Sequence, residues 1–338
     1  MTAAPPIRSA MSLAVEQAQA VKGSTYPNPP VGAVILSPSG EVVGVGGTEE
    51  AGGAHAEVVA LRSAGDRALG GTAVVTLEPC NHHGRTPPCV DALIRAGVAA
   101  VVYAVDDPNP VAAGGAGRLR AAGIEVTGGV AAGDVTGGSL REWLHKQRTG
   151  LPHITWKFAS SIDGRSAAAD GSSQWITGEA ARADVHRRRA AADAIVVGTG
   201  TVLADNPSLT ARMPDGRLAP HQPLRVVVGE REISPDSHVC SDDSATLLLR
   251  TRDPLEVVRT LADRTDVLLE GGPTLAGAFL RAGAVDRILA YIAPILLGGP
   301  VTAVDGVGVS SIGGALRWRY DGVEPIGPDL LLSLVPGT

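Results

Sequence analysis

Short runs of apolar, mostly β-branched residues alternate with amphipathic segments along the chain, and this alternation restricts the fold more than any other feature. In the first half the apolar runs lie at 31–36, 41–46, 71–80 and 99–105, where they predict strands. Several of the segments between them have the apolar spacing of helices. Strands that alternate with helices predict a layered α/β fold.

The chain of 338 residues is long enough for two such domains. A glycine-rich stretch at 128–150, which holds a predicted linker helix, separates the first α/β series from a second one that begins at 153. We therefore predict two domains, 1–146 and 147–338. No internal repeat relates the two halves, so a duplicated domain is not expected.

Composition and charge exclude several classes of protein. The net charge is −6 and aromatic residues make up 3%, so the chain offers neither a basic surface nor many stacking platforms to a nucleic acid. No apolar run approaches the length of a membrane span, and the N-terminus lacks the apolar centre of a signal peptide. We expect a cytoplasmic protein with no nucleic-acid or membrane partner. Three cysteines are too few for a disulfide framework, which favours metal-binding or reactive thiols.

Cys80 and Cys89 lie in the segment EPCNHHGRTPPC, and His55 and Glu57 lie upstream in HAE. The histidine is expected at a helix start after two glycines, Cys80 at a strand end, and Cys89 at another helix start. One histidine and two cysteines leave the fourth position of a tetrahedral zinc open for water, which is the arrangement of a catalytic site. Glu57 can then accept a proton from the water and pass it to a leaving amine.

This order of residues is typical of zinc deaminases, in which H-x-E is followed by P-C and a second cysteine. Here the second cysteine comes nine positions after the first, farther than in the P-C-x-x-C form. The longer loop brings His82, His83 and Arg85 towards the site, which suits a larger, anionic substrate. The alternative is a closed structural zinc with His82 or His83 as the fourth ligand. That alternative leaves the charge of Glu57 unexplained.

Two glycine-rich turns in the second half follow predicted strands. They are AIVVGTGTVLADNP (194–207) and LLEGGPT (268–274), and such turns can present backbone N–H groups to phosphate oxygens. Together they suit a dinucleotide, although each alone is more often a plain strand-to-helix turn. The pattern G-T-G-T-V-L departs from G-x-G-x-x-G, so a Rossmann domain is not predicted.

With these motifs the sequence resembles the bifunctional riboflavin-biosynthesis deaminase–reductases. The residues that carry the resemblance are TYPNPPVGAVI, GGAHAEVVAL, LEPCNHHGRTPPC and DDPNP in the first half, and WKFASSIDGR, SSQWITGEAARADVHRRRA, DAIVVGTGTVLADNPSLTAR and LEGGPTLAGAFL in the second. They span nearly the whole chain. The resemblance implies an N-terminal cytidine-deaminase-like domain of three α/β/α layers and a C-terminal dihydrofolate-reductase-like α/β domain.

The resemblance also implies the reactions. The first domain would use zinc, one ion per chain, to hydrolyse the 2-amino group of a diaminopyrimidinone ribosyl phosphate. The second domain would use NADPH to reduce the ribosyl group of the product to ribityl. The partner is then a small phosphorylated ribosylaminopyrimidine, and the family associates into homo-oligomers, so a dimer or tetramer is expected.

Residue roles in the first domain follow from the same resemblance. His55, Cys80 and Cys89 would bind zinc, and Glu57 would be the catalytic proton carrier. The expected substrate contacts are Asn28, His82, Arg85, Asp107 and Asn109. Asn28 could equally be a turn residue between prolines, and Asp107 a cap at a strand end. Arg85 stands where the family often has lysine, and VAAGGAG (111–117) lacks the basic residue expected in that loop.

In the second domain the resemblance assigns two sets of contacts. Those to the cofactor are Ala159, Trp175, Thr201, Asp205, Gly271 and Gly272. Those to the substrate are Lys157, Ser173, Thr177, Arg189, Leu209, Arg212 and Glu270. Two arginines suit a 5′-phosphate, because their planar forks match its oxygens. The proton donor of the reduction is left open among Lys157, Asp205 and water.

Other interpretations stay open at this point. In the run HRRR (186–189), at least two of the four residues could form a solvated helix face. Ser172 stands where the family has glutamate, and residues 229–246, with Cys240, match no motif. A nucleic-acid base editor would share the zinc site, but the acidic charge argues against it. The alternative that only one of the two domains is catalytically active is disfavoured, because both halves retain the motifs of the family.

Overall fold

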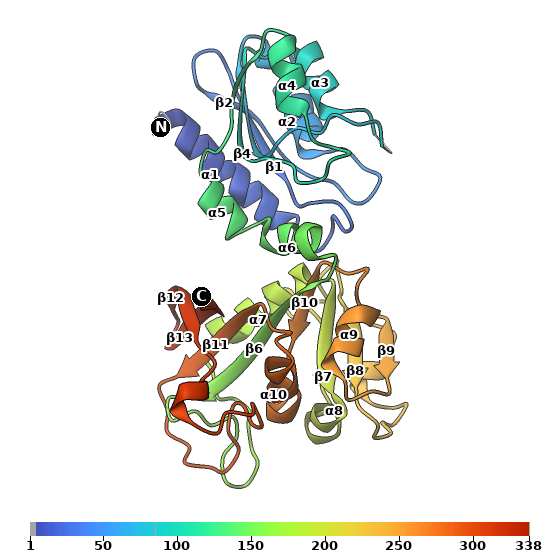
Figure 1. The fold of residues 1–338 in the computed structure, drawn as a ribbon, viewed down its shortest axis with the longest axis vertical. Helices are drawn as coiled ribbons and strands as arrows, with labels where there is room; N and C mark the ends of the chain where they lie inside the picture. Colours follow the sequence, from blue (N-terminus) through green and yellow to red (C-terminus); the bar gives the residue numbers. More distant parts are fainter. Residues whose placement is uncertain (1–4, 85, 338) are drawn as a thin grey trace. The chain divides into compact units, whose positions relative to one another are not determined.

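The computed structural model describes residues 5–84 and 86–337 (Figure 1). It divides into two compact units, Met1–Gly150 and Leu151–Thr338, and each has a sheet and a core of its own. None of the described helices combines the length and the apolar character that crossing a membrane requires. The fold is therefore a two-domain α/β protein, as predicted.

The first unit is built on a five-stranded sheet with the order β2-β1-β3-β4-β5. Its strands are β1 (Gly32–Leu36), β2 (Val42–Gly47), β3 (Thr72–Leu77), β4 (Ala100–Val105) and β5 (Glu125–Thr127). Its helices are α1 (Pro5–Ala20), α2 (Ala56–Ala64), η1 (Gly65–Ala68), α3 (Cys89–Ala96), α4 (Gly115–Ala121), α5 (Ala132–Thr136) and α6 (Arg141–Thr149). In Figure 1, α2, α3 and α4 lie on one face of the sheet and α1 and α5 on the other, which gives the three predicted layers.

Glycines in the first two strands let both helix layers approach the sheet closely. A Cβ atom added at Gly32 would lie 1.8 Å from the carbonyl oxygen of Ala14 in α1. One added at Gly44 would lie 2.2 Å from the carbonyl oxygen of Ala60 in α2. The backbone of α2, whose first turn carries Glu57, is therefore packed directly against the strands of the sheet, which fixes the position of the helix.

Strands β3 and β4 are parallel, so both end at the same edge of the sheet. The cysteine segment leaves β3 at this edge, and the segment Asp106–Asn109 leaves β4 there. Residues that lie about thirty positions apart in sequence are thus brought to one place. The carboxyl ends of parallel strands are where α/β proteins usually bind ligands.

The second unit has an eight-stranded sheet with the order β12-β13-β11-β6-β10-β7-β8-β9. Its strands are β6 (His153–Ser161), β7 (Ala194–Gly198), β8 (Leu224–Val228), β9 (Thr246–Leu249), β10 (Asp266–Leu269), β11 (Arg287–Ala293), β12 (Trp318–Ile326) and β13 (Asp329–Pro336). Its helices are α7 (Glu179–Ala191), α8 (Thr199–Asp205), η2 (His238–Cys240), α9 (Pro254–Thr260), α10 (Pro273–Arg281) and η3 (Ile312–Gly314). The strands from β11 to β9 are parallel, whereas β12 and β13 are antiparallel.

Alternate residues of β11 face different helices, which places α7 and α10 on opposite faces of this sheet. Leu289 and Tyr291 pack with α7, and Ile288 and Ala290 pack in the cluster that contains Phe279 of α10. The second unit is therefore also layered, with a covered parallel core.

Two features of the second unit bear on the sequence prediction. The segment that begins at Thr199 forms a short helix, α8, whose N-cap is Gly198, so the glycine-rich turn leads directly into a helix N-terminus. The C-terminal hairpin of β12 and β13 had no predicted counterpart, because β12 is largely exposed and lacks an apolar run.

Candidate active sites

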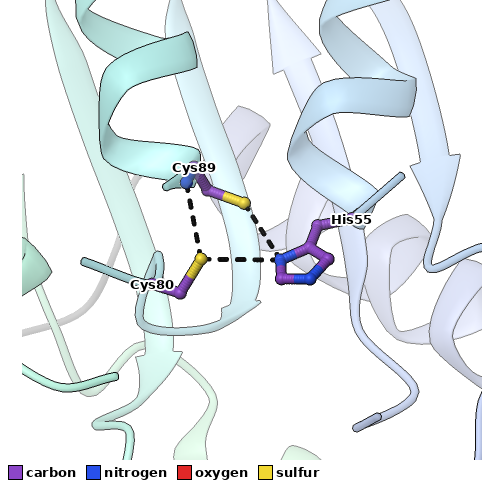
Figure 2. Close-up of side chains that lie close together, drawn as sticks. All are labelled: His55, Cys80 and Cys89. Atoms are coloured by element: carbon purple, nitrogen blue, oxygen red, sulfur yellow. Dashed lines mark hydrogen bonds between the residues drawn. The ribbon is translucent and has the colours of Figure 1, made fainter. Parts of the chain in front are cut away.

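Three side chains converge at the mouth of α2, and Figure 2 shows them pointing at one another. His55 is the N-cap of α2 in an extended conformation, Cys80 follows β3, and Cys89 is the first residue of α3. The Nδ1 atom of His55 lies 3.5 Å from the Sγ atom of Cys80 and 3.3 Å from that of Cys89. A tetrahedral zinc with ordinary Zn–N and Zn–S bonds separates such atoms by about 3.6 Å. The trio therefore fits a zinc ion bound through Nδ1.

The electrostatics of the trio favour a thiolate at Cys80. Its pKa is lowered to about 4 by the hydrogen bond from the Cys89 thiol, with further contributions from His55 and from the backbone N–H of Cys89, 3.4 Å away. Burial acts in the opposite direction but is outweighed. A thiolate is the form of cysteine that binds a metal ion.

Glu57 lies two residues after His55 and is only 4% exposed. Burial raises the pKa of its carboxyl to about 7, and the negative charge of Cys80 adds to the rise, while His55 opposes it. A carboxyl that titrates near neutral pH can both take up and release a proton under ordinary conditions.

A cavity of about 360 Å³ opens on this side-chain cluster. Four of the five predicted substrate contacts line it: Asn28, His82, Asp107 and Asn109. The fifth, Arg85, lies outside the described residues. Glu57, His55 and Cys80 line the same cavity, so the structure brings the predicted proton carrier, two of the predicted metal ligands and these polar side chains together.

The wall of this cavity includes residues that sequence reasoning missed, namely Thr48, Glu78, Thr86, Trp143 and Gln147. Trp143 and Gln147 belong to α6, which the sequence indicated only as a linker helix. No motif marks them. The one available signal was the scarcity of aromatic residues, which makes each tryptophan near a polar loop a candidate ring contact.

Hydrogen bonds hold the polar wall in place. The buried carboxylate of Glu78 accepts the backbone N–H groups of Ala116, at 2.8 Å, and Asp107, at 3.2 Å. Asp107 in turn accepts the N–H of Asn109 at 2.9 Å, so it is a loop cap as well as a cavity residue. The buried Nδ1 atom of His82 has no hydrogen-bond partner within the part of the chain that the structure describes. An unsatisfied buried polar atom in a cavity wall is suited to a ligand.

In the second unit, a buried ion pair lies at the end of β10. Arg189 of α7 donates from Nε and Nη2 to the two carboxylate oxygens of Glu270, at 2.7 and 2.9 Å. The ammonium of Lys157 on β6 lies 3.9 Å from the same carboxylate. Burial works to raise the pKa of Glu270, but Arg189 and then Lys157 hold it at about 2. Burial lowers the pKa of Lys157.

Arg189 also binds within the chain, because two of its donors are bound to Glu270 and a third donates to the Thr210 carbonyl at 3.2 Å; its contact with a substrate stays a prediction. The prediction for the HRRR run is wrong. Only Arg187 of the four is exposed, and both Arg187 and Arg188 bind the carboxylate of Asp184.

The remaining predicted residues of the second unit lie near the carboxyl end of a strand or in a segment that follows a strand. Gly272 is the N-cap of α10, and a Cβ atom added to it would lie 3.4 Å from Oγ1 of Thr201 in α8, so the two predicted cofactor turns adjoin. Trp175 is 69% exposed, and the guanidinium of Arg182 lies 4.8 Å from its ring centroid. The other members are Ala159 on β6, Asp205 at the end of α8, Ser173 and Thr177 on either side of Trp175, Gly271 after β10, and Leu209 and Arg212 after α8.

Comparisons with known proteins give a consistent result. Residues 6–105 match the cytidine and deoxycytidylate deaminase zinc-binding region, and residues 152–332 match the RibD C-terminal domain. The riboflavin biosynthesis protein RibD of Mycobacterium tuberculosis is 71% identical over 329 residues, which are 97% of either chain. The chain belongs to the RibD family. It is a deaminase and reductase of riboflavin biosynthesis, with a zinc-binding deaminase domain.

More distant RibD proteins match over the same extent. The Escherichia coli protein is 41% identical and covers 96% of this chain and 98% of its own. The Acinetobacter baumannii RibD structure has a TM-score of 0.86 at 37% identity, covering 98% of this chain and 99% of its own. A Thermotoga maritima structure, described as a diaminohydroxyphosphoribosylaminopyrimidine deaminase and 5-amino-6-(5-phosphoribosylamino)uracil reductase, has a TM-score of 0.89 at 31% identity, with the same coverage.

Proposed function

We propose that the first unit deaminates 2,5-diamino-6-ribosylamino-4(3H)-pyrimidinone 5′-phosphate and that the second unit reduces the product with NADPH to 5-amino-6-ribitylamino-uracil 5′-phosphate. The observation that carries the proposal is the metal-ligand trio with a buried carboxyl of raised pKa in the same cavity. The description of the Thermotoga maritima relative, which names this kind of deaminase and reductase, supports the choice of substrate.

In the deaminase, His55 Nδ1 and the sulfurs of Cys80 and Cys89 would hold zinc. The metal in a site with three protein ligands activates water as a nucleophile. Glu57 takes the proton released when water is activated and delivers it to the departing amino group, which leaves as ammonia. Among the described residues, no fourth histidine, cysteine or carboxylate joins the ligand atoms of His55, Cys80 and Cys89, and His83 is exposed. Both observations support an open catalytic zinc site over a closed structural one.

The cavity wall would hold the substrate. The free Nδ1 of His82, Asn28 and the Asp107–Asn109 loop offer hydrogen bonds to the pyrimidine and its sugar. Arg85, by its charge, is our candidate for the phosphate.

In the reductase, NADPH would lie across Ala159, Trp175, Thr201, Asp205, Gly271 and Gly272. The pyrimidine substrate would contact Lys157, Ser173, Thr177, Arg189, Leu209, Arg212 and Glu270. Hydride transfer to the sugar carbon requires orientation and a proton source. Lys157 suits the second task, because burial lowers its pKa and Glu270 fixes its position.

A direct assay tests the proposal. Purified chain mixed with the diaminopyrimidinone phosphate should release ammonia without NADPH, and should oxidise NADPH only after this release. Mass spectrometry should identify the deaminated and then the reduced product. Ammonia release without any later NADPH oxidation would contradict the reductase half alone.

Zinc content provides a prediction with a matched control. The wild-type chain should bind one zinc ion, and Cys89→Ser should lose it together with deamination, because three ligands become two. Cys240→Ser changes a cysteine outside the trio and should keep both. Elemental analysis and the ammonia assay measure the two properties. Zinc retained in full by Cys89→Ser would remove this cysteine from the ligand set.

A further inference from the structure

The unassigned segment 229–246 folds against a buried arginine. Arg225 on β8 is 0% exposed, and within the described residues no carboxylate lies close enough to form an ion pair with it; burial lowers the pKa of its guanidinium more than the charge of Asp243 raises it. A buried cation without a counterion is costly unless its donors are bound to other polar groups. The hydrogen bonds of this guanidinium therefore show which segments of the chain the arginine holds together.

The guanidinium binds main-chain carbonyls from two separate segments. From one side, Nη1 donates to the carbonyl of Ser208 at 3.4 Å. From the other, Nη1 donates to the carbonyl of His238 at 3.4 Å and to the Ser241 hydroxyl at 3.1 Å, and Nη2 donates to the carbonyls of Ser241 and Ser244. Arg225 thus ties the loop after α8 to the segment 238–244.

Two further contacts join the same segments. The backbone N–H of His238 donates to Oδ1 of Asn206 at 2.9 Å, and Nδ1 of His238 lies 2.9 Å from the Asn206 carbonyl. Leu209 packs in a cluster with Val239 and Ile233. Hydrogen bonds from a guanidinium, hydrogen bonds from His238 and apolar packing therefore hold the 206–212 loop from one side.

The loop is in a conformation that needs such support. Asn206 and Leu209 have φ angles of 42° and 54°, which L-residues other than asparagine rarely adopt. On its other side the loop reaches the buried ion pair, because the Thr210 carbonyl accepts a hydrogen bond from Arg189, the partner of Glu270.

We propose that Arg225, together with the segment 229–246, positions the 206–212 loop for the pyrimidine substrate of the reductase, so that Arg225 is a positioning residue. The inference rests on the proposed function, in which Leu209 and Arg212 contact that substrate. Arginine suits this role because its planar guanidinium has several N–H donors, enough to bind the carbonyls of two segments at once. An ammonium at the same place is a compact point charge and cannot span both segments with the same geometry.

The test uses the full chain, with the deaminase activity as an internal control. Arg225→Lys should raise the KM for the deaminated pyrimidine about tenfold, since a small displacement of a positioning loop is expensive for binding and reaction. Deamination and the Kd of NADPH should stay within about twofold of the wild type. General damage to the second unit would weaken NADPH binding as well, and this outcome in a folded protein would count against a specific positioning role.

A second pair of variants keeps the test decisive should Arg225→Lys fail to fold. Asn206→Gly tolerates the positive φ angle but removes the acceptor for His238, and it should raise the same KM. Asn206→Asp keeps an acceptor oxygen and should stay near the wild type. Hydrogen exchange of the backbone amides of 208–212 should be faster in Asn206→Gly alone, and this readout does not depend on catalysis. Unchanged exchange and unchanged KM in Asn206→Gly would overturn the inference, whereas a wild type without reductase activity but with the expected exchange pattern would overturn only the proposed function.

Discussion

Glu57→Gln is expected to lower the kcat of deamination by about 10³-fold, in the range that loss of a general acid–base group produces. The amide is nearly isosteric but cannot take up a proton. The other buried carboxylate of the cavity, Glu78, already accepts two backbone N–H groups and cannot substitute. Zinc content and NADPH-dependent reduction should remain, because Glu57 is not one of the three ligand side chains. Ammonia release, elemental analysis and NADPH oxidation with the deaminated pyrimidine supplied as substrate measure the three properties separately.

Glu50→Gln is the matched control, because Glu50 is an exposed glutamate seven residues upstream. It should keep both activities at wild-type levels. A Glu57→Gln protein that still deaminates within tenfold of the wild type would show that another group carries the proton. Loss of both activities in a folded Glu57→Gln protein would contradict two independent sites.

The first unit was largely predictable from sequence because its signals are local. Runs of β-branched residues indicate its strands, and His55, Cys80 and Cys89 each stand at a helix start or strand end that can be recognised nearby. Convergence of the three follows from the parallel pairing of β3 and β4 and from the position of α2 on the same sheet. The alternation of apolar and amphipathic segments could not predict that α6 forms part of the cavity wall, because Trp143 is brought to the cavity by packing and no motif marks it.

The second unit was less predictable, because its important contacts join distant residues. Arg189 and Glu270 are 81 positions apart, and a family pattern that assigns both to the substrate does not show that they bind each other. The support of the 206–212 loop by Arg225 is similarly non-local, and every donor involved binds a main-chain carbonyl or a serine hydroxyl. Every residue has a main-chain carbonyl, so the sequence does not indicate which carbonyls the arginine side chain binds.

Glu270→Gln should lower the kcat/KM of reduction by about 10²-fold or more and should also destabilise the second unit. Removing one partner of a buried ion pair leaves uncompensated charge, which costs about 3–5 kcal/mol. Here two cations, Arg189 and Lys157, lose their shared carboxylate. Hydrogen exchange of the β10 amides at increasing urea concentrations measures the free energy of unfolding of this unit. Deamination by the first unit should be unaffected.

The pH dependence separates this electrostatic cause from loss of packing. The pKa of Glu270 is about 2 in the folded chain and 4.5 ordinarily, so its ionised form is favoured by folding. That contribution, about 3 kcal/mol, is fully present above about pH 4.5 and is lost as the pH falls towards 2. The difference in unfolding free energy between wild type and Glu270→Gln should therefore shrink over this interval. Glu230→Gln breaks an exposed pair with Arg252 and should cost at most about 1 kcal/mol. A difference for Glu270→Gln that stays constant from pH 6 to pH 3 would point to packing instead of charge.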